Sequence, residues 1–155
     1  MSDLKGQTVC FTGHRKIIHK HLDERLDEVV SILAEDGFEY FGVGGALGFD
    51  LLAAKSVLRM RKKYPHIKLI IVLPCKDYCT RNHSAYLMEY GEIFKAADKL
   101  KILSDSYYQG CMHVRNKHLV DNSSVCVCYK YVNAGGTDFT VKYAHKKGLT
   151  VVDII

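Results

Sequence analysis

The chain has 155 residues, of which 48% are hydrophobic and 25% are charged, with a formal net charge of +5. This length favours one domain over residues 1–155, and this composition is typical of a soluble protein with a hydrophobic core. No apolar run is long enough to span a membrane, and Met1–Lys5 lacks the apolar segment of a signal peptide. We therefore expect a cytoplasmic protein with no membrane partner.

Strand and helix patterns alternate along the whole chain. The first half reads as strand, helix, strand, helix and strand at residues 8–12, 22–33, 39–42, 49–64 and 68–73. The second half reads as helix, strand, helix, strand, helix and strand at residues 82–97, 99–103, 112–122, 124–129, 137–147 and 150–154. This alternation predicts a three-layer α/β/α, Rossmann-like, doubly wound fold with a mostly parallel sheet of about six strands.

Three glycine-bearing turns follow apolar strand-like runs, at residues 13–15, 42–48 and 135–137. In an open α/β sheet, the loops at the carboxyl ends of the strands gather at one edge, where ligands bind. Glycine lets backbone N–H groups approach an anion, and the N-terminus of the following helix adds a positive partial charge. The turns therefore predict a site for a phosphate-bearing small molecule.

The first turn contains Gly13, His14 and Arg15. Arg15 carries a permanently charged guanidinium that suits phosphate or carboxylate. His14 can donate a hydrogen bond or act as an acid or base near neutral pH. A plain surface loop with solvated side chains is the alternative, but the position directly after a buried strand favours ligand binding.

The second turn contains Gly44, Gly45 and Gly48, followed by Asp50. It matches the dinucleotide pattern G-x-G-x-x-G only in part, and it follows the second strand rather than the first. We expect the backbone N–H groups of residues 44–48 to point at the edge of the sheet. Asp50 has two interpretations that the sequence leaves open: a cap of the helix start, or a ligand for a ribose hydroxyl or a base.

The third turn, Gly135-Gly136-Thr137, opens the last predicted helix. Gly136 allows close approach to a phosphate, while Thr137 is either a further donor or an ordinary N-cap. Arg115 and Asn116 lie near the start of the preceding helix and are expected to reach the same edge. Asp121 is a further candidate ligand, although an aspartate that ties loops together is the alternative there.

Cysteine and lysine patterns give weaker signals. The six cysteines show no C-x-x-C spacing, so we expect reduced structural thiols and no metal, with a site around Cys111 and His113 as the alternative. The basic clusters at residues 59–63 and 145–147 lie at the ends of predicted helices, where cations are favoured by the helix dipole. A nucleic-acid footprint is usually a broader basic face, so nucleic acid is not an expected partner.

Five motifs in order resemble the YpsA-like branch (DUF1273) of the SLOG superfamily, which is bacterial. The motifs lie at residues 10–15, 44–54, 110–116, 120–123 and 135–137. The resemblance implies a Rossmann-like fold that binds nucleotides or nucleotide-derived ligands, related to the LOG phosphoribohydrolases and to DNA-processing protein A. It carries over all the glycine-turn positions named above, together with Asp50, Arg115, Asn116 and Asp121.

One departure from the LOG pattern concerns catalysis. Residues 133–141 lack the P-G-G-x-G-T-x-x-E sequence, with Thr140 and Val141 where a catalytic carboxylate is expected, and Asp138 is out of register.

Two functions follow as hypotheses. The first is a sensor that binds a nucleotide or ADP-ribose-like metabolite, needs no cofactor, and signals through a protein partner or self-association.

The second hypothesis is a hydrolase of the N-glycosidic bond of a nucleotide. Such chemistry needs a carboxylate or histidine near the ribose. Asp50 and His14 are the first candidates, followed by Asp121 and Asp138. Whether the protein is an enzyme stays open at this point. DNA binding, by analogy with DNA-processing protein A, is a third and weaker hypothesis.

Overall fold

The computed structural model describes residues 4–78 and 83–155. Cys79 and the predicted helix start at residue 82 lie outside this described part, as does most of the Met1–Lys5 segment. In chain order the elements are η1 (Leu4–Gln7), β1 (Thr8–Gly13), α1 (Leu22–Glu35), β2 (Tyr40–Val43), α2 (Phe49–Arg61), β3 (Lys68–Leu73), α4 (His83–Ala96), β4 (Lys99–Ile102), α5 (Cys111–Asp121), β5 (Val125–Tyr129), α6 (Gly135–Lys146) and β6 (Thr150–Asp153).

The strands form one six-stranded sheet in the order β4-β3-β2-β1-β5-β6, and every pairing is parallel. β1 is central: Val9 pairs with Phe41 of β2 on one side and with Val125 of β5 on the other. Successive strands run outward from β1 to β4, and the chain then returns to the far side of β1 for β5 and β6. The strand order therefore reverses between β1 and β5, which is where open α/β sheets bind ligands.

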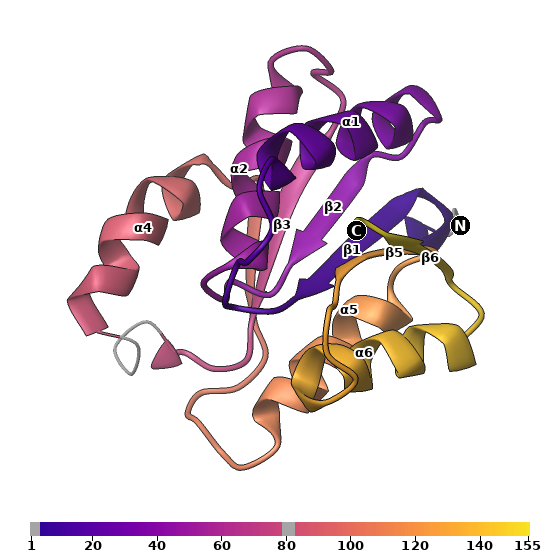
Figure 1. Ribbon diagram of the computed structural model, residues 1–155. Helices are drawn as coiled ribbons and strands as arrows, with labels where there is room; N and C mark the ends of the chain where they lie inside the picture. Colours follow the sequence, from indigo (N-terminus) through magenta and orange to yellow (C-terminus); the bar gives the residue numbers. More distant parts are fainter. Residues whose placement is uncertain (1–3, 79–82) are drawn as a thin grey trace.

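Helices cover both faces of the sheet. Figure 1 shows α1, α2 and α4 on one face, with α5 and α6 side by side on the other. The predicted three-layer, doubly wound, Rossmann-like fold is confirmed. The predicted boundaries hold to within a few residues; α2 ends at Arg61 rather than at Tyr64, because the backbone turns there ahead of Pro65.

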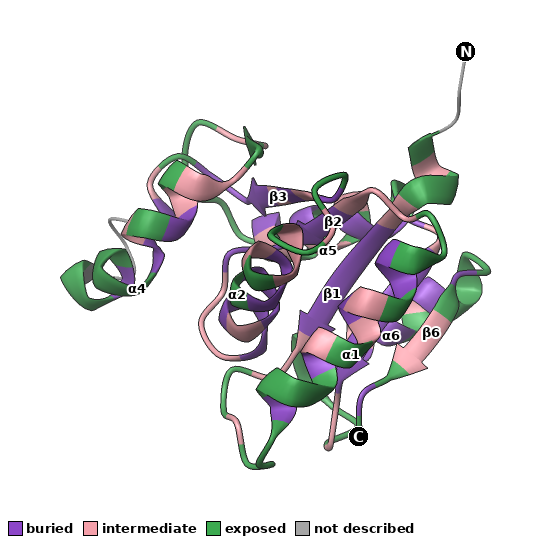
Figure 2. Ribbon diagram, turned by 90° about the horizontal axis from the view of Figure 1, so that it is seen from above, coloured by how far each residue is buried: buried purple, intermediate pink, exposed green. Residues whose placement is uncertain are grey.

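Most of the core lies between the sheet and the layer that contains α1 and α2. Figure 2 shows β1 buried along most of its length, and all five residues of β5 are buried. Leu26 and Val30 of α1 and Val57 of α2 are fully buried against Phe41 and Leu69 of the sheet. A smaller cluster under α5 and α6 includes Cys10, Leu119, Val120, Cys126 and Ala144.

The five cysteines in the described part of the chain are buried and form no disulfide with one another. Burial raises the pKa of the Cys75 thiol to about 12 and that of the Cys128 thiol to about 11. These thiols are therefore neutral at physiological pH and pack as small hydrophobic groups. In residues 4–78 and 83–155, no helix combines the length and apolar character that crossing a membrane requires.

Phe41 provides a test of the main core, because its ring is fully buried and lies 6.3 Å from that of Phe11. We expect Phe41→Ala to lower the free energy of unfolding by about 3–5 kcal/mol through lost burial and the remaining cavity. Leu100→Ala on the edge strand, where the side chain is 43% exposed, is the control and should change stability by less than about 0.5 kcal/mol. Urea denaturation measures both, and equal effects would contradict this assignment of the core.

Candidate functional site

A cavity of about 280 Å³ opens at the carboxyl edge of the sheet, at the reversal point between β1 and β5. It is lined by the first turn, by the start of α2, by α5 and by the first turn of α6. Nine of the predicted site residues line it: Gly13, His14, Arg15, Asp50, Arg115, Asn116, Gly135, Gly136 and Thr137. Segments separated by more than a hundred residues in sequence therefore meet here, as the topology requires.

The first two turns pack directly against each other. The N–H of Phe49 donates to the carbonyl of His14 at 3.2 Å, and the N–H of His14 donates to the carbonyl of Tyr129 at 3.1 Å. Gly48 has a positive φ of 81°, and a Cβ atom there would collide with the backbone of Arg15. Gly48 is thus required for the close contact of the two turns, although it does not itself line the cavity.

The buried side chain of Asp50 forms hydrogen bonds with the backbone of the second turn. One of its carboxylate oxygens accepts hydrogen bonds from the N–H groups of Gly44, at 3.2 Å, and Ala46, at 3.3 Å. Burial raises the pKa of Asp50, while the positive charge of Arg115 and the two N–H donors act in the opposite direction. Its carboxyl group is therefore held in place by the loop that precedes α2.

One expectation about the second turn was wrong, and one of the two interpretations left open for Asp50 is excluded. The residue that caps α2 is Gly48, so Asp50 lies inside the helix and is not its N-cap. The N–H groups of Gly44 and Ala46 point at Asp50 and not at the cavity, because the buried carboxylate needs hydrogen-bond donors. Gly44 and Gly45 support the site from behind and do not line it.

Arg115 is a buried positioning residue. Its guanidinium donates to the carbonyl oxygen of Gly44 and, through Nε, to Oδ1 of Asn116 at 2.8 Å. A Cβ atom at Gly44 would lie 2.7 Å from the guanidinium carbon, so only glycine leaves room for the arginine. Arg15, by contrast, is exposed at the mouth of the cavity, where Nη2 lies 3.4 Å from the hydroxyl of Tyr78. The two guanidinium groups bring positive charge to the cavity lining, which also contains the carboxyl group of Asp50.

His14 contributes an unpaired nitrogen. Its Nε2 atom is buried and has no hydrogen-bond partner in the described part of the chain, and its ring packs edge-on against Tyr131 with centroids 4.3 Å apart. Burial lowers the pKa of His14, and the positive charge of Lys130 lowers it further. The imidazole is therefore neutral at pH 7, and His14 is one of the residues that line the cavity.

The third turn forms the start of α6. The N-cap is Ala134, so Thr137 lies in the first turn of the helix. Of the two roles that the sequence left open for Thr137, that of N-cap is therefore excluded. Asp138 accepts ion-pair contacts at 2.8 Å from both Lys130 and Lys142, and these hydrogen bonds lower its pKa. It does not line the cavity, which argues against a role for Asp138 in catalysis there.

Asp121 lies apart from the other candidates, at the far end of α5. Its carboxylate accepts a hydrogen bond from Tyr143 at 2.7 Å and lies 3.9 Å from the ammonium of Lys147. The interpretation of Asp121 as a group that ties elements together therefore fits its contacts better. No cluster of three potential metal ligands occurs within the described residues, including the region of Cys111 and His113.

Several tyrosines support the site and were missed by the sequence analysis. The hydroxyls of Tyr86 and Tyr90 of α4 donate to the carbonyls of Gly45, at 2.6 Å, and Ala46. The hydroxyl of Tyr129 accepts a hydrogen bond from the N–H of Ile18 at 3.0 Å. The i, i+4 spacing of Tyr86 and Tyr90 indicates that both side chains lie on one face of a helix. It does not indicate which residues that face contacts.

This fold, with a small cavity at the reversal point of the sheet, is that of a Rossmann-like α/β protein. Residues 9–151 match the family model YpsA, described as the YspA SLOG family. The chain belongs to this family, which confirms the resemblance drawn from its motifs.

The curated relatives are bacterial. UPF0398 protein BH1768 of Halalkalibacterium halodurans is 28% identical over 138 residues, which cover 87% of this chain and 72% of the relative. UPF0398 protein BBR47_29830 of Brevibacillus brevis is 31% identical over 123 residues, covering 77% of this chain and 65% of the relative. The SPbeta prophage-derived protein YoqJ of Bacillus subtilis is 28% identical, with 80% of each chain covered.

Two solved structures of DNA processing protein A have the same fold. The protein from Helicobacter pylori gives a TM-score of 0.67 at 22% identity, and the alignment covers 97% of this chain and 66% of that chain. The protein from Streptococcus pneumoniae gives 0.68 at 18% identity, covering 97% of this chain and 50% of that chain. At these identities the likeness establishes the fold alone. The Helicobacter pylori protein binds single-stranded DNA. This property of a structural neighbour conflicts with the expectation that nucleic acid is not a partner.

Gly48 and Gly135 provide a matched pair for testing the contact between the turns. Both have positive φ, but a Cβ atom meets the Arg15 backbone at Gly48 and nothing within 4 Å at Gly135. We expect Gly48→Ala to lower the free energy of unfolding by at least about 3 kcal/mol. Gly135→Ala should cost about 1–2 kcal/mol from backbone strain alone. Thermal or urea unfolding gives both values, and similar losses would show that the turns are not packed as described.

Asp50 gives a pH-dependent test. Because its pKa is raised above 3.8 in the folded protein, the native state binds more protons than the unfolded chain between 3.8 and the raised value. The free energy of unfolding of the wild type, relative to that of Asp50→Asn, should therefore fall as pH rises through this window. Denaturation of both proteins over a pH series measures the difference. If the difference rises with pH instead, the pKa of Asp50 is lowered in the folded protein. Arg115 and the N–H donors then affect that pKa more strongly than burial does.

Proposed function

We propose that the protein binds a nucleotide or nucleotide-derived small molecule in the 280 Å³ cavity at the reversal point and acts as a ligand-sensing module. The observation that carries the proposal is the convergence of three groups that recognise phosphate and its attached sugar. They are the first turn of α6, the exposed guanidinium of Arg15 and the unpaired Nε2 of His14. Membership of the SLOG family supports the same class of ligand.

Each group has a role that follows from its chemistry. The N–H groups at the start of α6 lack intrahelical acceptors, and the helix dipole favours an anion beside residues 135–137. Gly135 and Gly136 have open space where a side chain would stand, so a phosphate can approach the backbone. Arg15 supplies the counter-charge at the mouth, and neutral His14 supplies a hydrogen bond deeper in the cavity. Arg115 and Asp50 keep the second turn in place.

Hydrolysis of an N-glycosidic bond is the second candidate function. Asp50 lines the same cavity, and a buried carboxyl group with a raised pKa is a plausible acid or base. The hydrogen bonds from Gly44 and Ala46 already engage one of its oxygens, which favours a structural role. We therefore place the sensor first.

Single-stranded DNA is an alternative phosphate-bearing ligand for this edge, because a structural neighbour binds it. The cavity accepts a phosphate from a strand as well as from a free nucleotide. The small volume of the cavity, about 280 Å³, favours the nucleotide. Binding that weakens steeply with added salt would instead indicate several phosphate contacts and hence DNA.

The test uses a panel of AMP, ADP, ATP, NAD, ADP-ribose, guanine nucleotides, cyclic nucleotides and a short oligo-dT. Calorimetry or thermal shift measures binding, and chromatography of the same samples detects release of free base. We expect at least one nucleotide to bind and remain intact. Arg15→Gln should raise its Kd at least about tenfold, equivalent to about 1.4 kcal/mol, without loss of stability, because Arg15 is exposed.

Arg25→Gln on the exposed face of α1 is the matched control, since it removes the same charge away from the cavity. It should leave the affinity unchanged. Base release that disappears in Asp50→Asn would support the hydrolase in place of the sensor. Oligo-dT binding with no nucleotide binding, or equal effects of the two arginine variants, would contradict the proposal. Size-exclusion chromatography with and without ligand tests whether self-association accompanies binding.

A further inference from the structure

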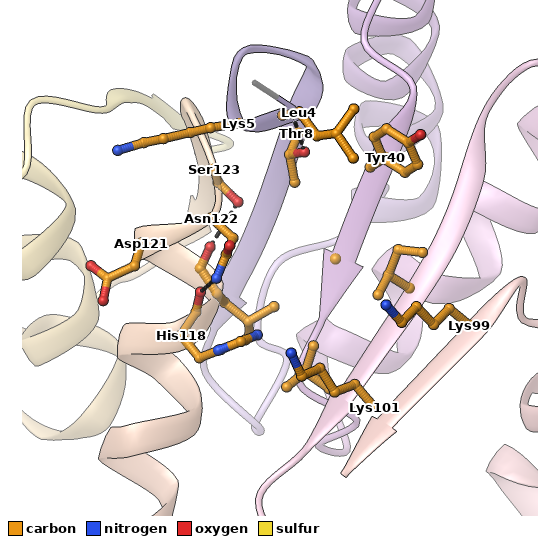
Figure 3. A pocket seen from close by; sticks show the side chains of 14 residues that line it. Leu4, Lys5, Thr8, Tyr40, Lys99, Lys101, His118, Asp121, Asn122 and Ser123 are labelled. Carbon is orange, nitrogen blue, oxygen red and sulfur yellow. Dashed lines mark hydrogen bonds between the residues drawn. The ribbon is translucent and has the colours of Figure 1, made fainter. Parts of the chain in front are cut away.

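A second and larger cavity, of about 680 Å³, lies on the face of the sheet that carries α5. Its floor comes from alternate residues of β2 and β3, one wall from alternate residues of β4, and the opposite wall from the C-terminal end of α5 (Figure 3). None of its lining residues lines the cavity at the reversal point, here called the nucleotide cavity after its proposed ligand. This second cavity, here called the sheet-face cavity, therefore needs an explanation of its own.

The floor of the sheet-face cavity is apolar. Ile70 and Val72 of β3 project from the same face of the sheet, and Leu119 of α5 lies beside them. Gly42 of β2 completes the floor, and a Cβ atom there would lie 3.1 Å from Leu119 Cδ2. A floor of this kind suits the hydrocarbon part of a small molecule, and the volume lies in the range of small-molecule sites.

The walls of the cavity carry positive charge. Lys99 and Lys101 extend from β4 on one side, and His118 faces them from α5 on the other (Figure 3). Within residues 4–78 and 83–155, neither lysine has a carboxylate at ion-pair distance. Burial lowers the pKa of His118, as do the charges of both lysines, while Asp121 opposes them. The two ammonium groups therefore face the cavity without a negative partner.

The acidic residue at the rim does not neutralise these lysines. Asp121 accepts a hydrogen bond from Tyr143 at 2.7 Å and lies 3.9 Å from Lys147, on the outer side of α5. Charge complementarity thus calls for an anion from solution on the β4 side, with an apolar body over the floor.

We propose that the sheet-face cavity binds a small amphipathic carboxylate, with its head group between Lys99 and Lys101 and its hydrocarbon body on Ile70, Val72 and Leu119. A monoanion fits better than a phosphate for two reasons. The C-terminal end of α5, with its negative partial charge, forms one wall. The lysines are point charges and lack the backbone N–H groups and guanidinium that line the nucleotide cavity.

A different role for the two lysines makes the opposite prediction. Lysines on an exposed edge strand such as β4 discourage pairing with another sheet, and this role requires no ligand. The difference is testable, because protection of an edge depends on charge at β4 alone, whereas a ligand site depends on both charge and the apolar floor.

Titration of the full chain with octanoate, followed by calorimetry and by NMR shifts of β2, β3 and α5, tests the proposal. We expect saturable binding, at least tenfold weaker binding by the double variant Lys99→Gln/Lys101→Gln, and weaker binding of octanol, which lacks the charge. Lys62→Gln/Lys63→Gln, which removes two exposed lysines beyond the end of α2, is the matched control and should bind normally.

Two further measurements test the apolar floor of the cavity and the choice of head group. Val72→Asn should weaken octanoate binding at least tenfold, with circular dichroism and thermal unfolding confirming that the variant is folded; if it is not, Ile70→Ser replaces it. Absence of saturable binding, equal effects of the two lysine pairs, or tighter binding of hexyl phosphate than of octanoate would overturn the proposal. A nucleotide that binds normally to the β4 double variant would show that the two cavities act independently.

Discussion

The buried carboxylate of Asp50 is the constraint on which the site depends. A carboxyl group buried away from water needs hydrogen-bond donors, and here the N–H groups of Gly44 and Ala46 provide them, with the guanidinium of Arg115 nearby. These contacts fix the second turn relative to α2 and α5. Gly48 then brings the same turn against the first turn at Arg15. The rigid second turn is therefore the platform on which His14 and Arg15 are presented to the cavity.

This arrangement separates support from recognition. The groups that hold the turns, Asp50 and Arg115 among them, are buried and already engaged with protein atoms. Arg15, by contrast, is exposed, and His14 has a nitrogen with no partner in the described part of the chain. The proposed binding would therefore leave the supporting contacts in place and would cost little reorganisation of the protein.

The fold was readable from the sequence, because apolar periodicity and glycine turns are local signals, and the position of the candidate site followed from the fold. The strand–turn order alone placed residues 13–15 and 135–137 at one edge, since parallel strands end together. The roles of Asp50 and Thr137 were not readable, because capping depends on where a helix begins to within one residue. Asp121 was a candidate because residues 120–123 resemble a family motif, yet α5 carries it to the other edge of the sheet. The tyrosine contacts depend on tertiary packing, which no local pattern encodes.

The central place of β1 also governs how the chain can fold. β1 pairs with β2 over a separation of about thirty residues but with β5 over more than a hundred, as in the pair Val9 and Val125. During synthesis, β1 to β4 can assemble while one edge of β1 still lacks its partner. That edge presents unpaired backbone N–H and C=O groups, flanked by the apolar side chains of β1, and it stays open until β5 has been made. The half-formed sheet is therefore the species most exposed to aggregation, and its lifetime depends on the speed of elongation between α4 and β5.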